Sequence, residues 1–254
     1  IAEFMDSYRR LTTPYNFQDG TQNLLTWDEA LTIAADRLKV CPPDKFAMVV
    51  STNSTNENLY VAQKFSRVVM GSHHVDTSAR LFYSQGFNAY LNILSESVPF
   101  SEIQSADLIL CLGLDTRYGR SVVGVEIKRA LNQGAVLVTI HPEQHNLQYI
   151  ADVWIQPQQD ELVQTINGIL DNVKNPTLET QALDNKKEQI IETGKLLKSA
   201  KKPILLIGSE FIKHAENLKL FFLTSELAEI TGAGIVPLPA QNNLVGSINM
   251  GTYP

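Results

Sequence analysis

Short apolar runs alternate along the chain with stretches in which apolar residues recur every three or four positions. The runs predict buried strands at 46–50, 73–77, 107–113, 135–140, 152–156, 203–209 and 235–239. Between the runs, the helical spacing predicts three amphipathic helices, each with its apolar residues on one face. These faces consist of Val61, Phe65, Val68 and Val69 in the first helix, Val123, Ile127, Ala130 and Leu131 in the second, and Leu162, Ile166, Ile169 and Leu170 in the third. Strands that alternate with amphipathic helices predict an α/β fold with largely parallel sheets.

Several residues indicate where the predicted helices begin and end. Ser54 and Glu57 have the spacing of a capping box, and Gly134 stands where a helix C-cap belongs. The more polar stretch 175–202 predicts a surface helix. A further helix is expected over 214–231.

The predicted topology also indicates where a ligand would bind. In open parallel sheets, ligands bind in the loops at the carboxyl ends of the strands. Those loops are expected at 51–58, 77–86, 113–121, 141–146, 209–214 and 240–247.

Composition narrows the possible partners. A formal charge of −6 and a pI near 5.4 argue against nucleic acid, whose binders carry a basic patch. Direct membrane insertion is not expected, since no apolar run approaches the roughly 18 residues that a spanning helix needs. The two cysteines cannot alone supply the about four ligands of a zinc or iron–sulfur site. A reducing cytoplasmic setting suits them.

Two loops carry candidate chemistry of their own. Gly113 and Gly119 lie between a predicted strand and a helix, without the three glycines of a dinucleotide-binding fingerprint. A nucleotide phosphate at the helix N-terminus and a plain strand–helix turn both remain open. His141, Glu143 and His145 lie at a strand end, where a metal site competes with a solvated polar loop.

Five collinear segments together resemble the molybdopterin oxidoreductases, above all formate dehydrogenase α subunits and the large iron–sulfur subunit of respiratory NADH dehydrogenases. The segments are LTWDEAL (25–31), STNENLYVAQKFSRVVMGSHHVDTSAR (54–80), ADLILCLGLDTRYGRSVVGVEIKRALNQGAVLVTIHPE (106–143), IADVWIQPQQDELV (150–163) and AEITGAGIVPLPAQNNLVGSINMG (228–251).

The resemblance implies two Rossmann-like parallel-sheet domains, one inserted in the other. Residues 14–100 and 199–254 would form a discontinuous domain, and 101–198 the inserted, dinucleotide-binding-like one. The family's amino-terminal domain, which carries iron–sulfur clusters in many members, and its carboxyl-terminal barrel-like domain would lie outside these residues. The chain is thus expected to be a fragment of a longer protein.

The family's metal-ligand position is altered in this chain, on the alignment that the resemblance implies. In active members, a cysteine or selenocysteine that follows an alanine–arginine pair binds molybdenum or tungsten. Here Arg80 is followed by Leu81 and then by Phe82 at the ligand position. A phenyl ring has no lone pair to donate, so the resemblance implies no protein metal ligand and a degenerate catalytic site.

The loops that hold the pterin dinucleotide in relatives are partly retained here. Gly113 and Asp115 stand at a Gly-Ser-Asn-like turn, and His141 and Glu143 replace the aspartate and arginine that grip the guanine end. Asp160 matches an acidic residue that contacts guanine. The remaining family pattern is kept by Gln241, Asn242 and Asn243. We expect a vestigial pocket with no cofactor bound, and molybdopterin guanine dinucleotide as the alternative ligand.

Three functional hypotheses follow. The first is a redox-inactive scaffold in an NADH dehydrogenase-type electron-transfer complex, whose partners would be the other subunits of that complex. The second is part of a formate dehydrogenase-like molybdopterin enzyme. The third is a binding module for another nucleotide. A cytoplasmic position, at most peripheral to a membrane complex, suits the first two.

Overall fold

The computed structural model describes residues 11–18, 20–77, 80, 82–117, 119–176, 186–239 and 241–253. It divides into two compact units. Unit 1 comprises residues 1–50, 54–76 and 246–254, and unit 2 comprises residues 51–53 and 77–245. Each unit is described by itself below.

Unit 2 is built on one five-stranded sheet. Its strands are β5 (Leu108–Leu112), β6 (Val136–Ile140), β7 (Val153–Ile155), β8 (Pro203–Ile207) and β9 (Gly234–Pro237). They lie in the order β7-β6-β5-β8-β9, and every neighbouring pair is parallel. The predicted α/β class with parallel strands is confirmed.

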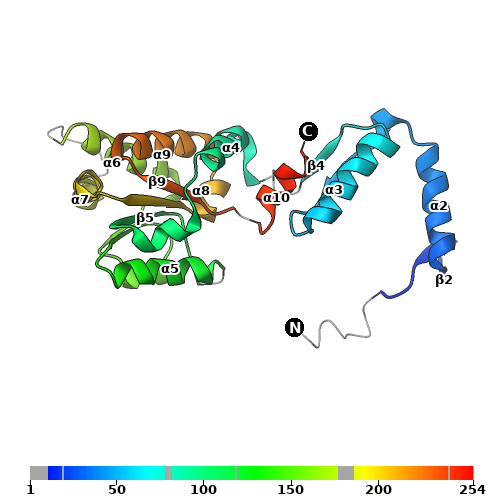
Figure 1. The fold of residues 1–254 in the computed structure, drawn as a ribbon, viewed down its shortest axis with the longest axis horizontal. Helices are drawn as coiled ribbons and strands as arrows, with labels where there is room; N and C mark the ends of the chain where they lie inside the picture. The colour runs from blue at the N-terminus through cyan, green and yellow to red at the C-terminus, as the bar shows by residue number, and fades with distance from the viewer. Residues whose placement is uncertain are drawn as a thin grey trace. The chain divides into compact units, whose positions relative to one another are not determined.

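Helices cover both faces of this sheet, which is why its central strands are buried along their whole length. Figure 1 shows α6 and α9 on one face and α5 on the other. The helices of unit 2 are α4 (Phe87–Ser95), α5 (Ser121–Leu131), α6 (Leu162–Lys174), α7 (Lys187–Ser199), α8 (Ser209–Lys213) and α9 (Asn217–Thr231). α10 (Leu244–Asn249) follows β9.

The predicted inward faces of two of these helices agree with the structure. In α5 the buried residues include Val123, Ile127 and Ala130, and in α6 they include Leu162, Ile166, Ile169 and Leu170. α7 departs from the prediction of a surface helix, because Ile190, Thr193, Gly194 and Leu197 are buried where α7 packs on α6. Residues 177–185 of the predicted helix lie outside the described residues.

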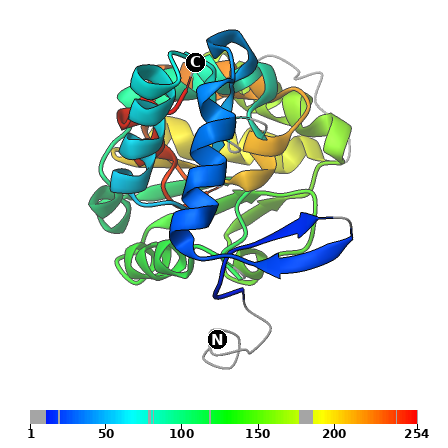
Figure 2. The ribbon, with the colours of Figure 1, turned by 90° about the vertical axis from the view of Figure 1, so that its right-hand side faces the viewer.

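Unit 1 begins with an antiparallel hairpin of β1 (Tyr15–Gln18) and β2 (Thr21–Leu24), which leads into α2 (Trp27–Lys39). Figure 2 shows this hairpin and α2 in blue. Thr26 and Glu29 form a capping box at the start of α2, with Thr26 N donating to Glu29 Oε2 at 2.8 Å. The unit continues with β3 (Met48–Val50), α3 (Asn56–Lys64) and β4 (Val75–Thr77), and β3 pairs with β4.

The predicted start and packing of α3 both need correction. The N-cap is Thr55, whose side chain accepts from Asn58 N, and not Ser54. Val61, Val68 and Val69 are exposed by 62%, 72% and 66% instead of facing a core. The chain turns into a π-helix over Phe65–Val69, which breaks the regular spacing on which the predicted face depended.

The division into units differs from the predicted domains. The prediction assigned 199–254 to a domain with 14–100. In the structure β8 pairs with β5 along all five residues of each strand, and β9 pairs with β8. Strand pairing therefore joins 203–237 to the predicted insert 101–198 in a single sheet.

Candidate functional site

The strand order of unit 2 reverses between β5 and β8. From β5 the chain proceeds to β6 and β7 on one side, and from β8 it proceeds to β9 on the other. The crevice outside the carboxyl ends of two such strands is where open α/β sheets bind ligands. The loops that leave β5 and β8 are thus the first place to look for a site.

Two glycines let these loops approach each other. Gly208 N donates to Leu112 O at 2.8 Å, and a Cβ on Gly208 would lie only 2.2 Å from Gly113 O. Gly113 itself has a φ of 62°, which favours glycine. The structure therefore gives the predicted site residue Gly113 a backbone role, because it lets the exits of β5 and β8 lie close together without offering a side chain.

A polar cavity of about 320 Å³ lies at this edge of the sheet. It is bounded by the loops that follow β5 and β9. Its lining residues are Gly119, Arg120, Pro239, Gln241 and Asn242. Two predicted site residues, Gln241 and Asn242, are thus brought together with an arginine that the sequence interpretation had not selected.

Arg120 is held in an unusual conformation. It is the N-cap of α5 with φ 58° and ψ 32°, and it is the one non-glycine residue with a positive φ in the described part of the chain. A left-handed L-residue costs about 1–2 kcal/mol. One Nη2–H of Arg120 donates to the Pro239 carbonyl oxygen, which ties the loop after β5 to the loop after β9.

The surroundings of Arg120 favour an anionic ligand. Burial lowers the pKa of the guanidinium, and the neighbouring Tyr90 and Tyr83 partly offset this, but an arginine stays charged. α5 has no side-chain cap at its N-terminus, so its first backbone N–H groups lack that partner. A cation beside a helix N-terminus suits a phosphate group.

The loop at 241–243 is fixed by the segment 51–53. Thr52 Oγ1 hydrogen-bonds Gln241 Oε1, and Asn243 N donates to Thr52 O at 3.1 Å. Gln241 and Asn242 line the cavity, whereas Asn243 is not among its lining residues. Segment 51–53 lies in one of the loops at the carboxyl ends of predicted strands, where a ligand was expected to bind.

A second cluster lies at the end of β6. The rings of His141 and His145 stack with centroids 4.7 Å apart, and both residues are buried. His141 Nδ1 accepts from Glu143 N at 3.0 Å, while the residue Glu143 is exposed. Asp115 Oδ1 accepts from Arg117 N at 2.8 Å, and the Asp115 charge reaches His145. His141, Glu143 and Asp115 are thus close to one another but do not line the Arg120 cavity.

Asp160 stands apart from both groups. It is exposed in the 3₁₀ turn Gln159–Glu161 that precedes α6. It follows β7 in the chain, and no contact described for it joins it to the cavity.

Phe82 and Arg80 interact with other side chains through aromatic rings. Lys213 Nζ of α8 lies 5.5 Å from the centroid of the Phe82 ring, and the Arg80 guanidinium lies 5.6 Å from that of Phe87. Phe82 is 36% exposed. Across the described ranges, no three His, Cys, Asp or Glu side chains converge as metal ligands. The residues present therefore fit an anionic cofactor at Arg120, whereas the Phe82 ring does not fit a metal.

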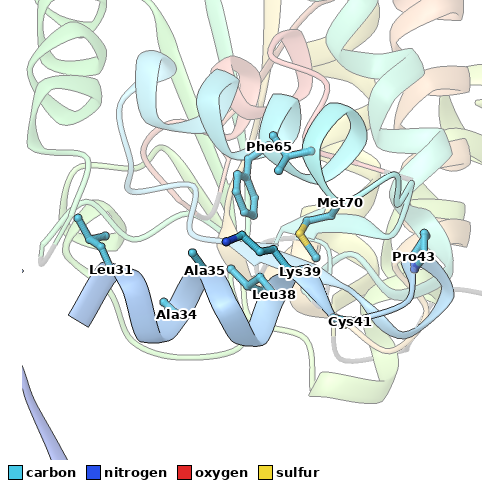
Figure 3. Close-up of a pocket in the computed structure, with 10 residues that line it drawn as sticks. Leu31, Ala34, Ala35, Leu38, Lys39, Cys41, Pro43, Phe65 and Met70 are labelled. Carbon is cyan, nitrogen blue, oxygen red and sulfur yellow. The ribbon is translucent and has the colours of Figure 1, made fainter. Parts of the chain in front are cut away.

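A larger cavity, of about 680 Å³, belongs to unit 1 and offers little chemistry. Figure 3 shows side chains of α2 pointing toward Phe65 and Met70 across it. Apolar side chains dominate its lining, which is Leu31, Ala34, Ala35, Leu38, Lys39, Cys41, Pro43, Phe65, Val69 and Met70. Size alone does not locate the site, since the smaller cavity holds the polar groups.

No helix in the described part of the chain is both long and apolar enough to span a bilayer.

Comparison with solved structures supports the fold. Acetylene hydratase from Pelobacter acetylenicus matches with a TM-score of 0.71 at 16% identity, over 91% of this chain and 36% of that one. The formyltransferase/hydrolase complex from Methylorubrum extorquens, solved with methylofuran, matches with a TM-score of 0.65 at 19% identity, over 95% and 66%.

Sequence comparison identifies the relatives. The F420-dependent formate dehydrogenase 2 subunit alpha of Methanococcus maripaludis is 28% identical over 99% of this chain and 43% of its own length. Formate dehydrogenase H of Escherichia coli is 24% identical over 96% and 40%. The chain thus spans less than half the length of these relatives. The model of the molybdopterin oxidoreductase family matches residues 10–251, and the chain belongs to that family.

Proposed function

We propose that this chain is the cofactor-binding centre of a formate dehydrogenase-like oxidoreductase, and that the Arg120 cavity holds the phosphate-bearing part of a pterin dinucleotide. The observation that carries the proposal is the joining of Arg120, Gln241 and Asn242 in one cavity at the carboxyl edge of the sheet. Family membership over residues 10–251 supports this ligand above other nucleotides.

Each group has a separate task in this scheme. Arg120 and the N-terminus of α5 would neutralise the phosphate charge, and the Gln241 and Asn242 amides would hydrogen-bond polar edges of the cofactor. When bound, the cofactor would supply the two-electron chemistry of formate oxidation. The residues of this chain contribute binding and orientation.

The relatives favour formate dehydrogenase over the NADH dehydrogenase-type module that the sequence also suggested. The Methanococcus relative is named as an alpha subunit, so we infer that other subunits are partners of the whole protein. We also propose that the whole protein carries iron–sulfur clusters outside these residues and that it is located in the cytoplasm.

Phe82 supports a second candidate function, a redox-inactive scaffold in an electron-transfer complex. A ring beneath the Lys213 ammonium group cannot coordinate molybdenum or tungsten. The two candidates are separated by metal content and by formate-dependent dye reduction in the full-length protein. Stoichiometric metal with activity supports the enzyme, whereas bound pterin without metal supports the scaffold.

The decisive variant is Arg120→Gly. Glycine adopts the left-handed backbone conformation without strain, so this change removes the guanidinium and leaves the turn intact. We expect pterin dinucleotide released from the purified full-length protein to fall by at least about tenfold, as loss of a charged hydrogen bond of about 1.5–3 kcal/mol implies. Arg129→Ala is the matched control, because Arg129 lies at the other end of α5 and pairs with Glu126. Equal pterin content in both variants would contradict the proposal.

A further inference from the structure

His145 caps a short 3₁₀ turn, Asn146–Tyr149, in the loop after β6. Its side chain accepts a hydrogen bond from the backbone N–H of Gln148, and Gln148 Oε1 accepts one from His145 N at 3.1 Å. This reciprocal pair requires a neutral imidazole. Both nitrogens of an imidazolium carry protons, so the charged ring cannot accept from Gln148.

The ring of His145 is fully buried, with two other rings against it. It stacks on the His141 ring at an interplanar angle of 23°. The Trp154 ring of β7 meets it edge-on, with the ring centroids 6.1 Å apart. His145 Nε2 is buried with no hydrogen-bond partner among the described residues. A protonated ring would therefore bury a positive charge with one of its two N–H groups, at Nε2, lacking an acceptor among the described residues.

Groups in the neighbouring loops both raise and lower the pKa of His145. Burial and then His141 lower the pKa of His145. The Glu143 backbone carbonyl, 3.3 Å from Nδ1, and the Asp115 carboxylate oppose them, while Arg117 adds to the lowering. The balance favours the neutral ring.

The capped turn is joined to the loop that carries Arg120. Asn146 Oδ1 accepts from Thr116 N at 3.2 Å, and Asn146 Nδ2 donates to Thr116 Oγ1 at 2.8 Å. Thr116 is buried and lies four residues before Arg120. Movement of the turn would therefore be transmitted to the loop beside the cavity.

We propose that His145 is a proton-operated latch, which holds the turn 146–149 and the adjoining segment 113–117 closed when neutral and releases both when protonated. The consequence that acid weakens ligand binding at Arg120 rests on the proposed function. The latch itself depends only on the contacts of His145 and Asn146.

The sign of the pH dependence follows from the lowered pKa. A histidine whose pKa is lower in the closed form binds protons more readily in the open form, so the closed form loses stability as pH falls below 6.5. Above that pH the latch contributes its full stability. A single proton changes the ratio of closed to open forms by at most about tenfold per pH unit.

Trp154 reports on the ring, because an imidazolium in contact with an indole quenches its fluorescence. The sequence contains one other tryptophan, Trp27, which is exposed, so Trp27→Phe isolates the signal. We expect the emission of Trp154 in this variant of the full chain to change between pH 7.5 and 5, with unchanged far-ultraviolet circular dichroism. His145→Asn should abolish the transition, since asparagine still caps but does not titrate.

His141→Asn is the matched control. It should keep the transition and move its midpoint to higher pH, because one cause of the lowered pKa is removed. In the unmodified chain, exchange of the Thr116 amide, corrected for its intrinsic rate, should accelerate across the same range. A transition that persists in His145→Asn, or Thr116 exchange that is flat with pH, would overturn the latch. If the pH transition is present but the protein binds no pterin at any pH, the proposed function is refuted and the latch is not.

Discussion

Gly208 lies where the chain leaves β8, so close to the exit of β5 that a side chain would meet backbone. The atom nearest to an added Cβ would be Gly113 O, at 2.2 Å, followed by Gly113 C and Leu114 Cα at 2.6 Å. Backbone atoms cannot rotate away as a flexible side chain can. The close approach of the two strand exits thus depends on the absence of a side chain at position 208.

Gly208→Ala should lower the free energy of unfolding by about 1–3 kcal/mol, the usual cost of overpacking. Gly119→Ala is the control, since a Cβ there meets nothing within 4 Å. Urea unfolding of both variants measures the difference. Equal midpoints and slopes would show that the two strand exits can move apart at no cost.

At the residue scale, the sequence located part of the candidate site. Gln241 and Asn242 were selected because they keep the pattern of the family that the sequence resembles, in a loop expected at the carboxyl edge of the sheet, and they do line the cavity. Arg120 could not be selected in the same way. A left-handed arginine at a helix N-cap contradicts both backbone and electrostatic preferences, so it depends on the surrounding fold.

At the scale of elements, an ion pair joins the beginnings of α6 and α7. Lys186 Nζ lies 2.7 Å from Glu161 Oε2, with the side chains only 10% and 20% exposed. The Lys186 hydrogen bond is the first cause of a lowered pKa at Glu161, followed by the hydrogen bond from Gln158. The pair fixes the chain where it enters α7.

Lys186→Met should destabilise the chain at pH 7 by more than Lys195→Met, which removes an exposed lysine of the same helix. Because the pKa of Glu161 is lowered, its contribution is complete above pH 4.5 and is lost as pH falls through the folded value. Urea titrations at pH 7 and in acid should therefore show the gap between the variants closing. A gap that is constant with pH would rule out the ion pair as its cause.

Elements with regular spacing were predicted well, and those under local distortion were not. α5 and α6 have a long apolar stripe that meets the sheet, so period and burial agree. The stripe predicted from Val61 onward runs from α3 into a π-helix, and Val61, Val68 and Val69 are exposed. Periodicity reveals which residues share a face, but not whether a neighbour covers that face.

At the scale of the whole molecule, buried residues are distributed unevenly between the units. α2 contains no buried residue, and α3 contains one, Leu59. In unit 2, by contrast, β5 and β8 are buried throughout. Burial of apolar area is the main favourable term in folding, so unit 2 should hold most of the stability.

Hydrogen exchange should therefore differ strongly between the units. We expect amides of α2 to exchange through low-energy opening and those of β5 and β8 to require unfolding of unit 2. Mass spectrometry of peptides from 27–39, in α2, and 203–207, in β8, measures the exchange in each unit. Equal protection would mean that other contacts stabilise α2 as firmly as the sheet.

The domain boundaries could not be derived from local pattern. The pairing of β5 with β8 joins residues more than ninety positions apart, and no periodicity within either strand specifies its neighbour. The parallel class, by contrast, follows from the alternation of strands and helices. Local sequence thus determines the kinds of element, while long-range pairing determines their grouping.

The backbone of Arg120 has an implication for laboratory evolution. Glycine would adopt the same turn with less strain, so selection of this chain for heat tolerance alone should readily recover Gly at position 120. Selection that also demands a bound anion should reject that change. Position 120 is thus where a thermostable library and a ligand-retaining library of the same chain should diverge.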